Sequence, residues 1–438
     1  MSTQKYNAIF DIGSYTYADY PDWIKAVALT KKACFNSAAE LGLIEPNKAQ
    51  VLTVACDSLL RHPYKEKFAV CLYGGSKDVF MRAFNQALFE VASSDVPTLT
   101  SEDLTIDRSI NAVVSTSTEV VRIFELKKIL EAAQRFAHVL ETKAEEFKDV
   151  QKLGRIGLSD YLPVTVGWEF AGYACGVRRL INKIQHELNI PILSTLGHDE
   201  IGSPKDFKQN FGQHANNHLS KMTGQQVENA NAADALIAGD NLITAHAVIQ
   251  ALSNQIWRVA RDIRLMCSGP RGGLQEITVP AVAPGSSIMP GKLNPVIAEM
   301  VFTTIDQVDA NHAGLVMALK SGWLEGGNSS FIPIRSLIKS ADLLARTMDC
   351  FSELCIKEIT VNPEHCKHLV EQSLALITLV KNLINEETAK KIVLYAKENR
   401  CSVPQACLAL KAIPKNQLNA IFGNIGLEVF EEEIKTSK

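Results

Sequence analysis

Long stretches without glycine or proline restrict the fold of this chain more than any other feature of its sequence. Neither residue occurs from Thr98 to Leu153 or from Ile334 to Val361, and Gly239 is the only one from Gln225 to Cys267. Both residues destabilise helix interiors, and the mean helix of a globular protein has only about 11–12 residues. These stretches therefore predict helices of roughly 30 or more residues, each about 45 Å long.

Apolar residues recur at helical spacing within two of these stretches, as on helices that bury one face. One stripe comprises Leu252, Ile256, Val259, Ile263 and Met266, and the other Val121, Phe124, Leu126, Ile129, Leu130, Ala133, Phe136 and Leu140. A single chain rarely supplies enough partners for such helices, so we expect an oligomeric bundle. Strand candidates are few and short: Tyr6–Ile12, Phe68–Tyr73 and Ile277–Val282. The predicted fold class is mainly α.

Polar segments and prolines divide the chain into three predicted regions. Residues 1–107 form an N-terminal mixed helical domain, closed by the polar run from Ser101 to Asp107. Residues 108–361 form a central long-helix bundle. Residues 362–438 form a small C-terminal helical domain that opens at Asn362-Pro363-Glu364.

Charge and cysteine content exclude several classes of protein. The 438 residues carry a net charge of −3, which offers no basic surface for nucleic acid. The ten cysteines are scattered singly, with no C-x-x-C pair and no histidines at zinc spacing, as expected of free thiols in a reducing cytosol. The first residues lack an apolar signal run, and no apolar stretch approaches membrane length. We expect a cytoplasmic protein with neither nucleic-acid nor membrane partners.

Residues 285–294, Gly-Ser-Ser-Ile-Met-Pro-Gly-Lys-Leu-Asn, give the strongest indication of function. Two glycines, a proline and two hydroxyls predict an irregular polar loop that could close over a small anion. Lys292, Asn294 and backbone N–H groups would then bind a carboxylate. Ser286 or Ser287 would lie at the reacting carbon.

Two plainer interpretations of this loop fit its sequence less well. A nucleotide-binding P-loop does not fit, because five residues separate Gly285 from Gly291 and Leu293 replaces the magnesium-binding hydroxyl. An ordinary surface turn has no need for Ile288 and Met289 beside a lysine. The functional interpretation is therefore favoured.

This loop resembles the signature loop of the fumarase/aspartase superfamily, which includes aspartate ammonia-lyases and class II fumarases. The similarity extends over residues 20–415, and it is carried by the segments Tyr20-Pro21 to Cys56-Asp57, Gly154-Arg155 to Glu169-Phe170, Arg261 to Ile277 and Pro295-Val-Ile-Ala-Glu299. The last segment is closer to the aspartase version of the motif than to the fumarase version.

The resemblance implies a three-domain helical fold in which the central helices of four subunits form one tetrameric core. It implies elimination of ammonia, an amine or water from a succinyl-type substrate to leave a fumarate-like product, with no metal or organic cofactor. Ser286 matches the general base, and Lys292 and Asn294 match the carboxylate ligands, with Ser287 beside them as a substrate-binding residue. Glu299 matches the acid that orients a partner side chain. The aspartase-like segment favours loss of ammonia or an amine over dehydration.

Three departures from the family pattern bear on specificity. Ile156-Gly157 replaces a Thr-His or Thr-Gln pair and supplies no side-chain donor. Ser115 and Thr116, in the nearest match to a block that normally ends Ser-Thr-Asn-Asp, are candidate substrate-binding residues. Lys77, in the segment that replaces the N-terminal substrate loop, or Arg82 just after it could supply a lost anion contact. A rival hypothesis is a lyase-fold protein without catalysis that binds small anions or has a structural role.

Three further motifs have plain structural interpretations. His214 and His218, with His198 nearby, have the i, i+4 spacing of a helical metal pair, but no glutamate lies between them, so a helix-surface role is favoured. Trp168 stands where relatives carry glutamine, and packing is favoured over narrowing of a pocket. The turn from Asp11 to Thr16 mimics an ATPase phosphate loop, but without a second such loop a strand and turn are favoured.

Overall fold

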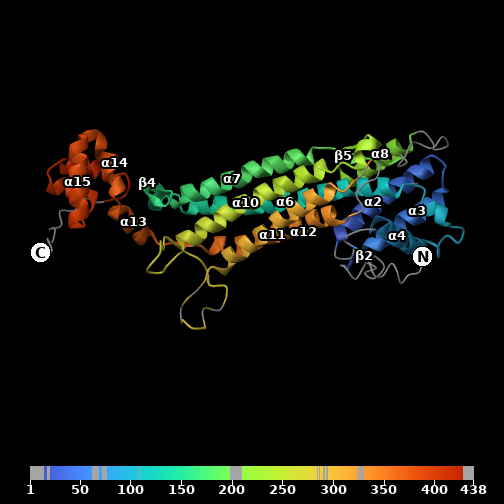
Figure 1. Cartoon of the computed structure of the whole chain (residues 1–438), viewed down its shortest axis with the longest axis horizontal. Helices are drawn as coiled ribbons and strands as arrows, with labels where there is room; N and C mark the ends of the chain where they lie inside the picture. Colours follow the sequence, from blue (N-terminus) through green and yellow to red (C-terminus); the bar gives the residue numbers. More distant parts are fainter. Residues whose placement is uncertain are drawn as a thin grey trace. The chain divides into compact units, whose positions relative to one another are not determined.

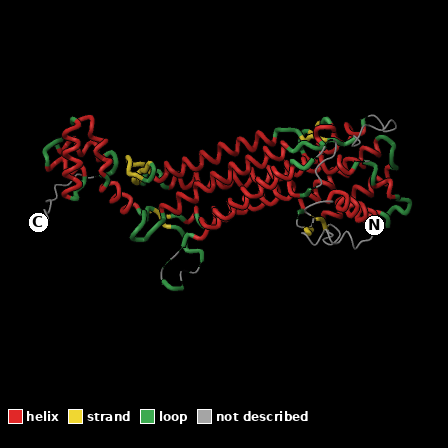
Figure 2. Tube along the Cα trace, in the orientation of Figure 1, coloured by secondary structure: helices red, strands yellow, loops and turns green. Residues whose placement is uncertain are grey.

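The computed structural model describes residues 14–16, 20–61, 69–71, 76–107, 109–197, 210–283, 285, 287–289, 292, 294–322, 324 and 330–427. Within these ranges the chain is mainly helical, as predicted, and its strands form two-stranded sheets (Figure 2). None of the helices described in these ranges is both long enough and apolar enough to cross a membrane.

The longest described helices are α6 (Ile110–Glu146), α7 (Val166–Leu188), α10 (Asp240–Met266), α11 (Val296–Leu319) and α12 (Ile332–Leu354), as labelled in Figure 1. The predicted length of roughly 30 or more residues is confirmed for α6, which has 37 residues. The predicted length exceeds the observed lengths of α10 and α12, which have 27 and 23 residues. The helix α10 begins directly after Gly239, the one breaker in its stretch.

The helix α7 was not predicted, because its sequence contains three glycines. One of them, Gly176, lies so close to α10 that an added Cβ would approach the amide of Gln255 to 2.3 Å. Glycine at this position therefore permits close helix packing, and its helix-breaking tendency is overridden by tertiary contacts.

Both predicted apolar stripes lie in the interior. All five residues of the stripe on α10 are buried. On α6 the residues of the predicted stripe are buried except Phe124 and Leu130, which are half-buried. Helical periodicity thus identified the faces that pack inward.

The chain divides into two compact units, and the long helices contribute residues to both. Unit 1 comprises residues 1–133, 179–254 and 303–347, and unit 2 comprises residues 134–178, 255–302 and 348–438. The predicted division into residues 1–107, 108–361 and 362–438 stays a prediction.

Besides parts of the long helices, unit 1 contains shorter helices and two pairs of strands. They are α2 (Pro21–Glu40), α3 (Pro46–Arg61), α4 (Ser76–Ala92), α5 (Ser101–Leu104), α8 (Phe211–Thr223), α9 (Ala232–Ala235), the antiparallel pair β1 (Ser14–Thr16) and β2 (Ala69–Cys71), and the parallel pair β5 (Ile192–Ser194) and β6 (Val227–Asn229). The helix α2 packs against α3 and α8. Trp23 of α2 lies at the centre of an aromatic cluster, with its ring 5.8 Å from Phe80 and 5.9 Å from Phe331.

Unit 2 contains the remaining strands and the C-terminal helices. The elements are the antiparallel hairpin β3 (Gln151–Ile156) and β4 (Ser159–Thr165), the antiparallel pair β7 (Ile277–Thr278) and β8 (Thr360–Val361), the helices α13 (Pro363–Gln372), α14 (Ile377–Val380), α15 (Glu386–Asn399), α16 (Val403–Ala409) and α17 (Lys415–Gly423), and the 3-10 turns η2 (Ile356–Glu358), η3 (Leu374–Leu376) and η4 (Lys381–Leu383). The C-terminal helices enclose an apolar core around Leu376, Ile392 and Phe422.

The strand candidates at 68–73 and 277–282 contain β2 and the shorter β7, whereas Tyr6–Ile12 lies outside the described residues. The hairpin β3–β4 was not predicted. Its two-residue turn consists of Gly157 and Leu158, with φ of 58° and 66°. A leucine with positive φ is uncommon, so the sequence carried only a weak turn signal.

Candidate active site

The predicted loop connects β7 to α11 in unit 2. Its described side chains, at Ser287, Ile288, Met289, Lys292 and Asn294, are exposed. Backbone bonds shape it locally: Lys292 N–H donates to Met289 O at 3.2 Å, and Val296 N–H donates to Asn294 O at 2.9 Å. Ser286, the predicted base, lies outside the described residues. The described part of the loop therefore presents one cation, Lys292, and one amide, Asn294, to solvent.

Glu299 lies in the first turn of α11, directly after this loop. Its Oε1 is 2.9 Å from Nη2 of Arg264 in the last turn of α10. Both side chains are about half exposed. Arg264 was not singled out from the sequence, although it belongs to the segment that carries the family resemblance.

The turn between α10 and the loop is closed by its own hydrogen bonds. Ser268 Oγ donates to Leu265 O at 2.6 Å and accepts from Leu274 N–H at 3.0 Å. Glu276 N–H donates to Met266 O at 2.9 Å. These bonds return the chain to the end of α10 and fix the position of Glu276, the residue before β7.

Glu276 is fully buried and joins a network of charges beneath the β3–β4 hairpin. It accepts from Arg155 Nη1 at 2.7 Å and lies 3.3 Å from Lys152 Nζ. Lys152 also bonds Glu169 of α7 at 2.8 Å, and burial is the main cause that raises the pKa of Glu169. The network balances two cations against two carboxylates. Arg155 and Glu169 of the second motif block therefore hold the hairpin in place.

The tip of this hairpin is apolar and exposed. Ile156 and Leu158 are 64% and 70% exposed, and Gly157 lies between them. Trp168, at the start of α7, is 68% exposed, so the prediction that it packs was wrong for this chain on its own. It lines an open cavity of about 830 Å³ in unit 2, together with Leu158, Arg258 and the charges beneath the hairpin. No side-chain donor is present at positions 156 and 157.

Ser115 and Thr116 lie on α6 in unit 1. Thr116 is buried, and its hydroxyl accepts from Thr195 N–H at 3.2 Å. Ser115 is half-buried and donates to Ala235 O at 2.9 Å. Lys77 belongs to α4, but its side chain lies outside the described residues. Both hydroxyls are thus already engaged with the backbone of the same unit.

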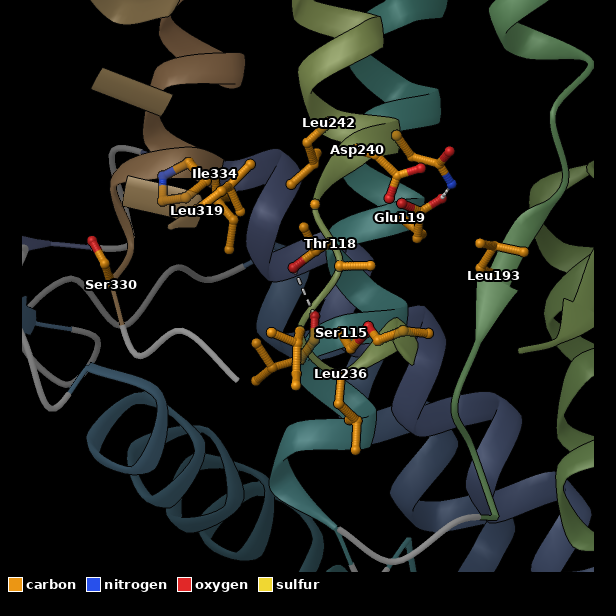
Figure 3. Close-up of a pocket in the computed structure, with 17 residues that line it drawn as sticks. Ser115, Thr118, Glu119, Leu193, Leu236, Asp240, Leu242, Leu319, Ser330 and Ile334 are labelled. Atoms are coloured by element: carbon orange, nitrogen blue, oxygen red, sulfur yellow. Dashed lines mark hydrogen bonds between the residues drawn. The ribbon is translucent and has the colours of Figure 1, made fainter. Parts of the chain in front are cut away.

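Ser115 lines a small cavity of about 90 Å³ together with Glu119 and Asp240 (Figure 3). Glu119 Oε2 accepts from Arg122 Nε at 3.0 Å and from Asn241 Nδ2 at 3.2 Å. Burial is the main cause that raises the pKa of Glu119, against the opposing charge of Arg122. Glu119 was not singled out from the sequence as a functional residue. In this unit it is a half-buried anchor for Arg122 and Asn241.

Three carboxylates of unit 1, Asp22, Glu125 and Asp342, lie close enough to share a cation. Lys128 Nζ already fills that position, at 2.8, 2.7 and 2.6 Å from the three carboxylates. A metal ion has no vacant place among them.

Comparisons with known proteins agree with the family resemblance of the loop. A family model described as Lyase matches residues 4–309. The chain is 28% identical to an aspartate ammonia-lyase of a Bacillus species, over 92% of this chain and 89% of that protein. It is 30% identical to a class II fumarate hydratase of Chromobacterium violaceum, over 95% of this chain and 93% of that protein.

Among solved structures, a fumarate lyase:delta crystallin from Brucella melitensis bound to cobalt superposes with a TM-score of 0.88 at 27% identity. The superposition covers 94% of this chain and 92% of the Brucella chain.

Proposed function

We propose, because this chain belongs to the fumarase/aspartase superfamily of lyases, that it eliminates ammonia, an amine or water from an aspartate- or malate-like substrate to give fumarate or a fumarate-like product. The observation that supports this proposal most is the loop at 285–294, which carries Lys292 and Asn294 as exposed side chains next to Glu299. The aspartase-like Pro295–Glu299 segment favours carbon–nitrogen over carbon–oxygen cleavage.

The difficult step removes a proton from the carbon next to a carboxylate, which concentrates negative charge on that carboxylate. A catalyst must therefore bind this carboxylate more tightly in the transition state, where the extra charge has developed, than in the ground state. We assign this task to Lys292 and Asn294, with Ser287 as a further donor. A charge-assisted hydrogen bond contributes about 1.5–3 kcal/mol, so two such contacts would accelerate the reaction substantially.

We assign proton abstraction to Ser286. A serine hydroxyl is a poor base at its ordinary pKa, so the loop must close, exclude water and stabilise the alkoxide with its N–H groups. Glu299 would act through its neighbours as a positioning residue, because its carboxylate is paired with Arg264.

The second carboxylate and the leaving group need donors from elsewhere. We assign one contact to Lys77 and one to Ser115, whose hydroxyl could exchange its bond to Ala235 O for a substrate oxygen. Thr116 is buried and bonded to Thr195 N–H, so we assign it a positioning role. We further propose a homotetramer, because the long helices leave large apolar side chains exposed on the single chain, such as Trp168 of α7 and Met317 of α11. We also propose a cytoplasmic location, which the singly scattered cysteines support.

The test is a panel of aspartate, malate and N-substituted aspartates, in which ultraviolet absorbance reports a new conjugated double bond. A signal that disappears in Ser286→Ala while the variant keeps its melting temperature supports the assignment. An undiminished rate in Ser286→Ala would remove the serine from the mechanism.

The second candidate is a lyase-fold protein that binds small anions without turnover. The donor-free tip at Ile156 and Gly157 is the observation that favours it. This candidate is supported if no substrate in the panel gives an absorbance change while small dicarboxylates raise the melting temperature. That result would exclude lyase activity on the substrates of the panel.

A further inference from the structure

His214 and His218 lie one turn apart on α8, so their side chains project from the same face of the helix. They are partly exposed, at 37% and 20% of their side-chain surface. The histidine spacing typical of a helical metal pair is therefore realised on an accessible surface of unit 1. The sequence pattern alone shows no carboxylate close to the two histidines.

The facing helix supplies that carboxylate. Glu40 is the last residue of α2, and its two oxygens bridge the two imidazoles. Its Oε2 lies 2.8 Å from His214 Nδ1, and its Oε1 lies 2.9 Å from His218 Nε2. The hydrogen bond from His214 is the main cause that holds the pKa of Glu40 below its ordinary value, so the carboxylate is ionised at neutral pH.

We propose that Glu40, His214 and His218 form a divalent-metal site, best suited to Zn²⁺, that joins α2 to α8. Two imidazoles and one carboxylate are a common protein ligand set for this ion, with metal–ligand distances of about 2.0–2.2 Å. The present nitrogen–oxygen distances are those of hydrogen bonds, in which each imidazole N–H donates to a carboxylate oxygen. A bound Zn²⁺ replaces these protons, because metal ligands must be deprotonated.

The surroundings of the three side chains allow the ion to enter. Ligand atoms of a tetrahedral Zn²⁺ lie about 3.3 Å apart, whereas the ligand atoms of Glu40, His214 and His218 do not all lie within 4.8 Å of one another. Both imidazoles must therefore turn toward one point when the ion binds, and their partial exposure leaves room for this rotation. A cavity of about 300 Å³ adjoins Glu40 and His218 and is also lined by Asn36, Gln50 and Thr53. This space accommodates the water that completes the coordination.

The backbone beneath the site is held in place. Ser37 Oγ of α2 donates to Phe211 O at the start of α8, at 3.0 Å. The end of α2 is closed by Leu43 N–H bonding Ala38 O at 2.8 Å. Among the described residues, Glu40 forms no ion pair with a lysine or arginine, in contrast to the carboxylates around Lys128. Only the side chains need to adjust when the ion binds.

The test uses the untagged full-length chain, stripped of metal with a chelator that is then removed. Isothermal titration with zinc chloride at neutral pH should show one strong site per chain, and Zn²⁺ should raise the melting temperature. His214→Gln, His218→Gln and Glu40→Gln should each weaken binding by at least about tenfold. The matched control is His368→Gln, which removes an exposed histidine of α13 and should bind Zn²⁺ like the parent.

Two further measurements keep the result unambiguous. Without zinc, each variant must melt close to the parent, since exposed ion pairs contribute little to stability. Anomalous diffraction at the zinc edge should place the ion between α2 and α8. A parent that binds no Zn²⁺, variants that bind it unchanged, or an anomalous peak at other residues would overturn the proposal. Each outcome is independent of lyase activity.

Discussion

Arg264 in the last turn of α10 and Glu299 in the first turn of α11 form an ion pair, with 2.9 Å between Nη2 and Oε1. Each charge also complements its own helix, because a cation is favoured at a helix C-terminus and an anion at an N-terminus. The Arg264 guanidinium lies 5.7 Å from the centre of the Phe302 ring, which adds a cation–π contact. The pair therefore orients Glu299 at the point where the loop enters α11.

Removing this pair should alter turnover more than stability. Arg264→Gln should change the free energy of unfolding by less than about 1 kcal/mol, because both side chains are about half exposed. If Arg264 acts by orienting Glu299, Arg264→Gln and Glu299→Gln should lower kcat by similar factors, and the double variant should fall no further. Urea denaturation and initial rates measure the two effects. Fully additive losses in kcat would show that the residues act separately.

Lys292→Ala should lower kcat/KM by about tenfold to a hundredfold with little change in melting temperature. The side chain is exposed, so its loss removes no packing, whereas a charge-assisted contact contributes about 1.5–3 kcal/mol. Lys367→Ala, an exposed lysine of α13, is the matched control and should leave both quantities unchanged. A large fall in melting temperature for Lys292→Ala would instead make this lysine structural.

The mainly helical fold could be predicted because α6 and α10 contain neither glycine nor proline, and α12 contains only Pro333, in its first turn, where proline is tolerated. The helix α7 could not be predicted in this way, since it contains three glycines, and one of them, Gly176, packs closely against the Gln255 side chain of another helix. The hairpin turn at Leu158 was missed for a different reason: a leucine with φ of 66° is uncommon, so the sequence carries only a weak turn signal.

The site was predictable where its residues are adjacent in the sequence. Lys292, Asn294 and Glu299 lie within eight positions and could be recognised as one motif. The partners of these motifs lie far away in the sequence: Arg264 is 35 positions from Glu299, and Glu40 is 174 positions from His214. A single sequence contains no signal for such pairs, so the bridge between Glu40 and the two histidines became visible only in three dimensions.

Glu276→Gln should destabilise unit 2 by about 3–5 kcal/mol. Glu276 is fully buried and balances Arg155 and Lys152, so a neutral side chain leaves buried positive charge without compensation. Chemical denaturation measures the loss. Glu145→Gln is the control, because its ion pair with Lys148 is exposed and should contribute less than about 0.5 kcal/mol. Equal, small losses in the two variants would contradict the assignment of Glu276 as an anchor.

Acid should destabilise the protein through His246, a buried histidine of α10 that contacts the half-buried His312 of α11. His246 is fully buried, with Nε2 2.9 Å from Ser340 Oγ and Nδ1 3.1 Å from Nδ1 of His312. Burial, reinforced by His312, lowers the pKa of His246 from 6.5 to about 4.

The folded state therefore keeps this imidazole neutral, whereas the unfolded chain takes up a proton as the pH falls below about 6.5. Stability is lost between about pH 6.5 and pH 4, and the free energy of unfolding should be about 2 kcal/mol lower at pH 5 than at pH 7 from His246 alone. Urea titrations at both pH values should show this difference in the parent and in His368→Gln. His246→Gln should reduce it, because it removes the titrating group. An undiminished difference in His246→Gln would assign the acid sensitivity to other groups.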